Sequence, residues 1–287
     1  MDKKIRDIAA NLSYRAELIR RRTLEIIRCA GGGHTGGDLS AVDLLATLYL
    51  HVLNVTPANP SDPNRDRFVM SKGHCVEALY CTLAQAGFIP DSLLNSYGAF
   101  GSVLAGHPTK KVPGVEVNSG SLGHGLSVGV GMSIAAKMNG QTYLTYVLMG
   151  DGEQGEGSIY EAAMAAGHYK LDNLIAIIDR NGLQISGRTE DIMSLEPIRA
   201  RWEAFGWEVT EVNGNDVPAL VETFAAMTQS KGKPRLLIAK TVKGKGVSFM
   251  ENVAKWHHGV PNDDQLEQAK SEIDRRIASL KAQLLNC

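Results

Sequence analysis

The sequence predicts an α/β fold in which a largely parallel sheet is flanked by helices. In the middle of the chain, short apolar runs alternate with longer helix-like runs, which is typical of repeated β-α-β units. A glycine-rich turn follows the first apolar run, and open parallel sheets bind ligands beyond the carboxyl ends of their strands. The strand-like runs are 143–149, 174–178, 207–212 and 235–241, and the helix-like runs are 158–170, 197–205 and 217–229.

The chain on either side of this pattern is expected to be helical. Residues 5–28 place apolar side chains three or four positions apart among charged ones, and the runs 42–52 and 76–86 also favour helices. A C-terminal helical tail is expected over 262–285, where Asn262 and Gln265 can form a capping box. Its apolar stripe is expected to pack on the protein's own core. No repeat or linker is evident, so we expect a single domain over residues 1–287.

Composition excludes several classes of function. The 287 residues include 30 Lys and Arg against 31 Asp and Glu, so the net charge attracts neither nucleic acid nor anionic membranes. The longest aliphatic run, 174–178, is far shorter than the roughly 18 residues of a membrane-spanning helix. The N-terminus lacks the apolar segment of a signal peptide, and four cysteines form no C-x-x-C pair. We therefore expect a cytoplasmic protein with reduced thiols, in which Cys75 beside His74 is a weak candidate nucleophile.

The segment Gly150–Gly157 suggests a phosphate site that needs a metal ion. A glycine-rich turn before a helix lets backbone N–H groups approach an anion, but Asp151 would repel that anion unless a cation lay between them. Mg²⁺ binds through carboxylates together with substrate phosphates. Asn181 stands 30 residues after Asp151, about the length of one βαβ unit, so it should reach the neighbouring strand end. The alternative is two ordinary turns, with an Asx-turn at Asn181.

Five of the eight histidines directly follow a glycine, whereas 30 glycines in 287 residues predict about one. A histidine in a glycine loop is held by the backbone and stays accessible, which suits proton transfer or recognition of hydroxyl groups. These histidines are His34, His74, His107, His124 and His168.

Gly150-Asp151-Gly152 followed by Asn181 resembles the diphosphate-binding motif of thiamine diphosphate enzymes. The run 152–158, with 161–162 and 166–168, is similar to that of transketolases. The resemblance implies a thiamine diphosphate-binding fold of the PP type, with Mg²⁺ (or Ca²⁺ or Mn²⁺) held by Asp151, Asn181 and the backbone carbonyl of Leu183. It also implies that Gly152 lies against the diphosphate.

The same resemblance assigns roles to the histidines. His34 resembles a histidine that contacts the donor sugar and takes part in proton transfer, and His107 resembles one that contacts the C1 hydroxyl of the donor. His74 is similar to a histidine near the cofactor. His258 is similar to one beside the diphosphate and the substrate, with His257 as its competitor.

Further positions follow from the resemblance. The backbone of Gly120 and Leu122 is expected to meet the aminopyrimidine ring, and His124 stands where the family often has glutamine. Glu156 resembles an acidic residue that contributes to catalysis and cofactor binding in a carboxylate network across the subunit interface. The lysines of the segment after the last strand are expected to be solvated rather than to reach the diphosphate. These lysines are Lys240, Lys243 and Lys245.

The resemblance covers about residues 15–262, whereas a full transketolase continues into a pyrimidine-binding domain and a C-terminal domain. It therefore implies the N-terminal subunit of a split transketolase of pentose phosphate metabolism. With a partner subunit that carries those domains, in an α2β2 heterotetramer, it would transfer a two-carbon ketol unit from a ketose phosphate to an aldose. The donor and acceptor sugars stay open.

Two alternatives remain at this point. The α subunit of a thiamine-dependent 2-oxoacid dehydrogenase E1 shares the metal motif, but its substrate lacks the hydroxyl groups that these histidines would recognise. A non-catalytic binding module of the same fold would be expected to lose the metal pair or the histidines.

Overall fold

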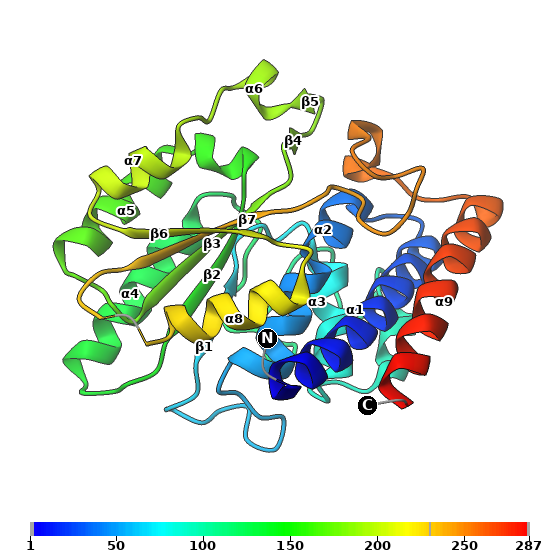
Figure 1. Ribbon diagram of the computed structural model, residues 1–287, viewed down its shortest axis with the longest axis horizontal. Coiled ribbons are helices and arrows are strands. Elements are labelled where there is room, and N and C mark those ends of the chain that lie inside the picture. The colour runs from blue at the N-terminus through cyan, green and yellow to red at the C-terminus, as the bar shows by residue number, and fades with distance from the viewer. Residues whose placement is uncertain (1–2, 230, 286–287) are drawn as a thin grey trace.

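The computed structural model describes residues 3–229 and 231–285, which contain a five-stranded sheet with helices on both faces (Figure 1). The strands of this sheet run in the order β1-β2-β3-β7-β6, and every neighbouring pair is parallel. The predicted fold class is confirmed, and each predicted strand is present with small shifts at its ends. The strands are β1 (Arg67–Met70), β2 (Thr145–Gly150), β3 (Leu174–Arg180), β6 (Glu208–Asn213) and β7 (Arg235–Lys240).

The sequence does not predict β1. This strand pairs with β2, from Arg67 opposite Thr145 to Met70 opposite Leu148. Four residues are too few to show a period, and the chain around them is rich in turn residues, so the segment looks like a loop. The strand matters because it brings the residues that follow it to the same edge of the sheet as the ends of β2 and β3.

Successive residues of the central strands point to opposite faces, so the sheet divides two separate cores. Tyr146 and Leu148 of β2 lie in one core, whereas Val147 and Met149 lie in the other. Both faces of β2 are buried, as expected for a parallel strand covered by helices on each side. The first core is covered by α1 (Lys3–Ala30), α2 (Thr35–Thr47), α3 (Val76–Gln85) and α8 (Val217–Met227), and the second by α4 (His124–Met138), α5 (Gly157–His168) and α7 (Ile198–Ala204).

The first and last helices of the described chain pack side by side (Figure 1). The last, α9 (Asp263–Leu285), begins with the predicted capping box. The Gln265 N–H donates to Asn262 Oδ1 at 2.8 Å, and the Asn262 N–H donates to Gln265 Oε1 at 3.0 Å. Ala269 and Ile273 are buried against α1. The predicted packing of the apolar stripe on the protein's own core is confirmed.

Two helices on the N-terminal side differ from the prediction. Helix α2 begins at Thr35, well before the predicted run 42–52, and a π-helical turn continues it. Helix α4 is not predicted as an element, although the run 128–131, with its two glycines, suits tight helix packing either inside the domain or at a dimer interface. A Cβ on Gly129 would lie 2.5 Å from Cγ2 of Val147, whereas Gly131 faces open space. Internal packing against the sheet therefore accounts for Gly129.

No helix within residues 3–229 and 231–285 is both long enough and apolar enough to cross a membrane. Cys29, Cys75 and Cys81 carry free thiols, and Cys287 lies outside the described residues. Burial raises the pKa of the Cys75 thiol. Since the thiolate is the nucleophilic form, a buried neutral thiol is inert, and Cys75 is no longer a candidate nucleophile.

Candidate functional site

A cavity of about 500 Å³ lies at the carboxyl edge of the sheet. Its walls come from the ends of β1, β2, β3 and β7, from the loop before α2 and from the segment before α9. Segments that lie far apart in the sequence therefore meet where the parallel strands end. The cavity is lined by most of the site residues expected from the sequence: His34, His74, Gly120, Leu122, Asp151, Gly152, Glu156, Asn181 and Leu183.

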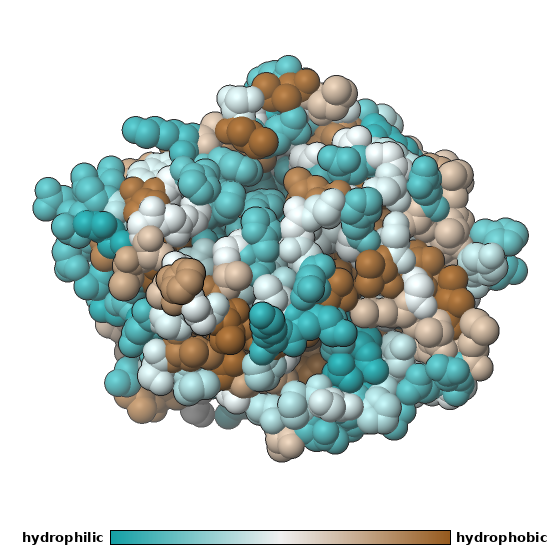
Figure 2. Space-filling model, turned by 180° about the vertical axis from the view of Figure 1, so that it is seen from behind, coloured by the Kyte–Doolittle hydropathy of each residue, from teal (hydrophilic) through white to brown (hydrophobic). Residues whose placement is uncertain are grey.

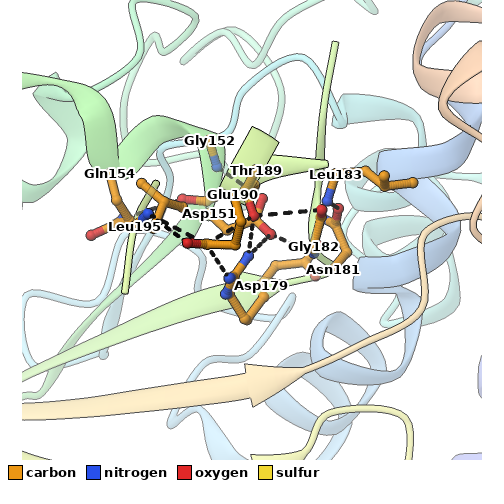
Figure 3. Close-up of polar contacts among 12 residues, drawn as sticks. Asp151, Gly152, Gln154, Asp179, Asn181, Gly182, Leu183, Thr189, Glu190 and Leu195 are labelled. Carbon is orange, nitrogen blue, oxygen red and sulfur yellow. Dashed lines mark hydrogen bonds and ion pairs between the residues drawn. The ribbon is translucent and has the colours of Figure 1, made fainter. Parts of the chain in front are cut away.

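Asp151 directly follows β2 and is buried at this edge (Figure 3). Its Oδ1 accepts a hydrogen bond from the Gly152 N–H at 2.8 Å, and its Oδ2 accepts one from the Gly182 N–H at 2.6 Å. Burial and the nearby Asp179 raise the pKa of Asp151, and these donors oppose that rise. Because β2 and β3 are parallel neighbours, the strand end that carries Asn181 lies beside it. The expected adjacency of the two strand ends is confirmed.

The oxygens at this edge attract cationic side chains. The Arg180 Nη1 lies 3.2 Å from Asp151 Oδ2, and the Lys243 Nζ donates to the Leu183 carbonyl at 3.3 Å. Asn181 Oδ1 accepts from the Leu183 N–H at 3.1 Å. A carboxylate, an amide and a carbonyl together are the hard oxygen donors that suit Mg²⁺, so the residues present fit the expected metal. In the described chain no three His, Cys, Asp or Glu side chains cluster as metal ligands. Such a site would therefore use neutral oxygens, from the Asn181 amide and the Leu183 carbonyl, beside the Asp151 carboxylate.

Arg180 also connects this edge to the segment after β3. Its guanidinium donates to Thr189 Oγ1 at 2.6 Å and to Glu190 Oε1 at 2.9 Å. These two residues begin α6 (Thr189–Ile192). The side chain of Asp151 and the helix α6 are therefore held by one arginine.

Three histidines that line the cavity pack together. The ring centroids of His34 and His74 are 5.1 Å apart, and the ring of His257 stacks on that of His74 at 5.6 Å. Burial lowers the pKa of His34 to about 4, of His74 to about 2 and of His257 to about 3. Neighbouring positive charge contributes as well, mainly from His258 for His34, from Lys72 for His74 and from Lys243 for His257. All three rings are neutral near pH 7 and can accept protons or hydrogen bonds.

The remaining predicted histidines lie at the rim of the cavity or away from it. His107 is exposed and packs against Gly120, where φ is +145° and a Cβ would lie 2.7 Å from His107 Cδ2. His258 is exposed, with its ring centroid 4.7 Å from that of His34. His257, its competitor, lines the cavity itself. His124 is exposed at the first position of α4 and does not line the cavity.

Lys243 contradicts the expectation that the lysines after the last strand are solvated. It is only 3% exposed, and its Nζ lies 2.9 Å from His257 Nδ1 inside the cavity. Burial and the nearby Lys72 lower its pKa. Lys240 and Lys245 do face solvent and pair with acidic side chains. Lys243 comes shortly after β7, so its place at a strand end is the signal that could have identified it.

Two further residues of the cavity were not predicted. Lys72 follows β1, and its Nζ pairs with Asp179 Oδ2 at 2.5 Å. Burial would raise the pKa of Asp179, but the Lys72 ammonium holds it below its usual range. Glu153 accepts hydrogen bonds from Ser71 Oγ, from the Gly123 N–H at 2.8 Å and from the Gly150 N–H at 2.9 Å. Both residues depend on the end of β1, which the sequence does not predict as a strand.

A family model described as the thiamine diphosphate-binding domain of transketolase matches residues 13–276. The chain belongs to the transketolase family. This finding confirms the resemblance and the thiamine diphosphate-binding fold expected from the sequence motifs.

Its relatives include one of the subunits of the apulose-4-phosphate transketolase of Phocaeicola vulgatus. The two are 59% identical over 94% of this chain and 96% of that subunit. A subunit of the 6-deoxy-6-sulfo-D-fructose transketolase of a Clostridium species is 40% identical over 93% of this chain and 98% of that one. The solved transketolase of Campylobacter jejuni superposes with a TM-score of 0.83 at 31% identity, over 98% of this chain and 48% of that one. The chain thus spans about half of a transketolase of known structure, but nearly all of these subunits.

Proposed function

We propose that this chain is the N-terminal subunit of a split transketolase, which transfers a two-carbon ketol unit from a ketose phosphate to an aldose together with a partner subunit. The observation that carries the proposal is the meeting of Asp151 and Asn181 with a wall of neutral histidines across one cavity. A diphosphate and its metal ion fit the first wall, and the hydroxyl groups of a sugar fit the second. A 2-oxoacid dehydrogenase is not favoured, because the relatives and solved neighbours are transketolases.

Thiamine diphosphate, when bound, supplies the electron sink for breaking a carbon–carbon bond beside a carbonyl group. This chain would hold it through the metal ligands Asp151, Asn181 and the Leu183 carbonyl, with the Gly152 backbone against the diphosphate. Lys243 adds a positive charge on the same wall, and a lysine is a common phosphate partner.

The other cavity residues orient the ring and the sugar. The backbone of Gly120 and Leu122 would meet the aminopyrimidine ring, with His74 near the cofactor. His34 has a pKa of about 4, so it can accept a proton from a sugar hydroxyl. His107 would contact the donor from the rim.

The cavity geometry favours His257 over His258 for contact with the diphosphate, since His257 lines the cavity and lies against Lys243. His258 would then contact the sugar from its position beside His34. Glu156 is exposed at the cavity wall, where a carboxylate of a second subunit could reach it.

Exposed apolar side chains beside the cavity support a partner subunit. Ile185 lines the cavity and is 74% exposed, and Met193, which follows the cavity residue Ile192, is 63% exposed. Figure 2 shows apolar side chains at the top of the molecule, over the segment that carries α6. A partner with a pyrimidine-binding domain would cover this surface and close the cavity, and we propose an α2β2 assembly. Free thiols support a cytoplasmic location.

The test is reconstitution with a candidate partner chain. Thiamine diphosphate and Mg²⁺ are supplied, with ketose phosphates such as those related to apulose 4-phosphate as donor substrates. Release of the aldose product is then measured. We expect transfer only when both chains are present. Transfer by this chain alone would contradict the split-subunit proposal, and decarboxylation of a 2-oxoacid by the complex would contradict the reaction type.

Replacement of Asp151 tests the metal site within the same complex. Asp151→Ala should abolish the part of thiamine diphosphate binding that depends on Mg²⁺, measured by titration calorimetry with and without the ion. Asp191→Ala, an exposed aspartate of α6 outside the cavity, is the matched control. Unchanged Mg²⁺-dependent binding by Asp151→Ala would refute the metal assignment.

A further inference from the structure

Two buried carboxyl groups lie beneath the loop that carries His34. Asp38 is on α2 and Glu77 is in the first turn of α3, and neither side chain is more than 1% exposed. Within the residues that the structure describes, neither forms a salt bridge with a basic side chain. Burying two carboxylates without a counter-charge is costly, so their contacts need an explanation.

One oxygen of each carboxyl group has an ordinary donor. Asp38 Oδ1 accepts from the Ala78 N–H at 2.9 Å, and Glu77 Oε1 accepts from the Tyr97 hydroxyl at 2.5 Å. The other two oxygens, Asp38 Oδ2 and Glu77 Oε2, are buried and find no donor among the described residues. The two carboxyl groups act on each other, and an ionised carboxylate can only accept hydrogen bonds. One proton held by the pair would supply the donor that these two buried oxygens lack.

The backbone of His34 is attached to the two residues of this pair in different ways. The Glu77 carboxyl group interacts with the backbone of His34, whereas the His34 carbonyl accepts from the backbone N–H of Asp38 at 3.1 Å in the first helical bond of α2. The preceding residue must be a glycine, because a Cβ on Gly33 would lie 2.6 Å from Glu77 Oε1. The backbone on either side of the His34 ring is therefore fixed against the carboxyl pair.

We propose that Asp38 and Glu77 are positioning residues for His34: a carboxylic acid and a carboxylate that share one proton and fix the His34 loop to the start of α3. Neither side chain lines the cavity, so both act through the backbone of His34. The role in catalysis rests on the proposed function, whereas the shared proton does not.

The shared proton makes the stability of the fold depend on pH. Burial and mutual repulsion raise the pKa of Asp38, and burial raises that of Glu77. In the unfolded chain both groups ionise near pH 4. Above that range the folded state holds one more proton than the unfolded state. The unfolding constant therefore rises about tenfold for each unit by which the pH increases, until the pair in the folded protein loses its proton.

The groups that face the pair do not hide this effect between about pH 7 and 8, where each of them has nearly the same charge in the folded and the unfolded chain. Burial and neighbouring charge keep the surrounding thiols and phenols protonated, the lysine charged and the imidazole of His34 neutral across that range. These groups are Lys72, Cys75, Tyr80, Cys81, Tyr97 and His34.

The shared proton is tested by denaturant unfolding of this chain at several pH values, without cofactor or partner. In Asp38→Asn the amide can donate to Glu77, so no shared proton is needed, while its oxygen still accepts from Ala78. We expect the slope of the logarithm of the unfolding constant against pH to decrease by about one, because the folded variant no longer holds the extra proton. At pH 8 the unfolding constant should be at least tenfold below that of the wild type. An unchanged pH dependence would overturn the proposal.

Asp43→Asn is the matched control on the same helix. Asp43 pairs with the buried Arg20 at 2.9 Å, so removing its charge should raise the unfolding constant rather than lower it. The same chemical change at the two sites is thus expected to act in opposite directions.

The positioning role is tested in the reconstituted complex. Glu77→Ala should lower kcat at least tenfold with little change in the Kd for thiamine diphosphate, and Glu77→Gln, which keeps an acceptor for Tyr97 and the His34 N–H, should restore most of kcat. Equal kcat for Glu77→Ala and the wild type would overturn the positioning role. Should Glu77→Ala fail to fold, Glu77→Gln decides the positioning role instead. A kcat for Glu77→Gln as low as that of His34→Ala would overturn the role. If the wild-type complex shows no transfer, the proposed function fails, but the unfolding experiment still decides the shared proton.

Discussion

At the scale of single residues, the candidate site joins neutral bases to fixed positive charges. His34, His74 and His257 have lowered pKa values because they are buried, whereas Lys72 keeps its charge through Asp179. Burial without a partner favours the neutral form of a histidine, and a carboxylate favours the charged form of a lysine. The two kinds of group can therefore serve different ends in one cavity, with the neutral bases accepting protons or hydrogen bonds and the cations attracting a diphosphate.

Lys243 provides a prediction at this scale. Lys243→Met keeps the length of the side chain but removes its charge from the cavity wall. We expect the complex to bind thiamine diphosphate at least tenfold more weakly in the presence of Mg²⁺, because a charge-assisted hydrogen bond is lost. Calorimetric titration measures the change. Lys240→Met, on the exposed part of the same segment, is the control. Equal affinities for the two variants would show that Lys243 does not contact the diphosphate.

The residues that the sequence identifies correctly are those whose position follows from a strand end. Asp151 and Asn181 could be placed together because parallel neighbouring strands end at one edge. The strand end before Lys243 could have placed it near the cavity, but its burial depends on how its loop packs against α2, where a Cβ on Gly36 would lie 3.0 Å from Lys243 Cγ. Likewise, the sequence cannot tell whether His257 or His258 faces the cavity, because that depends on the orientation of the turn that carries both.

At the scale of elements, the cavity depends on loops that are held to one another. Glu153 is central to this, because its buried carboxylate accepts from Ser71 after β1, from Gly123 before α4 and from Gly150 at the end of β2. Burial raises the pKa of Glu153, and these donors oppose the rise. One side chain therefore sets the spacing of the loops that carry His74, Leu122 and Asp151.

Replacement of Glu153 by glutamine tests this connection. The amide group of Glu153→Gln would face N–H or O–H donors and leave at least one of them without an acceptor. We expect the free energy of unfolding to fall by about 1–3 kcal/mol, measured by urea denaturation. Glu222→Gln, on the exposed side of α8, should change it little. A Glu153→Gln variant as stable as the wild type would argue against the three-loop connection.

Elements were predictable where their periodicity is long enough to recognise. The strands after residue 140, the long terminal helices and the capping box at Asn262 could all be identified, because hydrophobic spacing and cap chemistry are local signals. Strand β1 and helix α4 could not, since one is very short and the other is rich in glycine and carries apolar residues on all sides, which leaves no periodic stripe. Their existence is decided by packing against the sheet.

At the scale of the whole molecule, one edge of the sheet carries both the cavity and the most exposed apolar side chains near it. Ile185 lines the cavity, and Met193 follows α6 on the same segment. Arg180 connects this segment to Asp151. A partner that covers the segment would therefore lie close to the metal ligands, which agrees with an active site completed by two chains.

Met193 provides a prediction at this scale. Met193→Lys places a charge on the surface that the partner would cover, and a buried unpaired charge is strongly unfavourable. We expect the Kd for the partner chain to rise at least tenfold in sedimentation or surface-binding measurements. Met138→Lys, which changes another exposed methionine at the end of α4, serves as the control. Loss of affinity in Met138→Lys alone would place the interface on a different face.

The contact between Thr35 and Gly259 has a consequence for how the chain acquires its shape. The Thr35 hydroxyl donates to the Gly259 carbonyl at 2.5 Å, and the two residues lie 224 positions apart in the sequence. At synthesis rates of about 5–20 residues per second, at least ten seconds separate the appearance of the two residues. During translation the histidine loop near residue 34 therefore lacks this contact until the segment that carries His257 and Gly259 has left the ribosome.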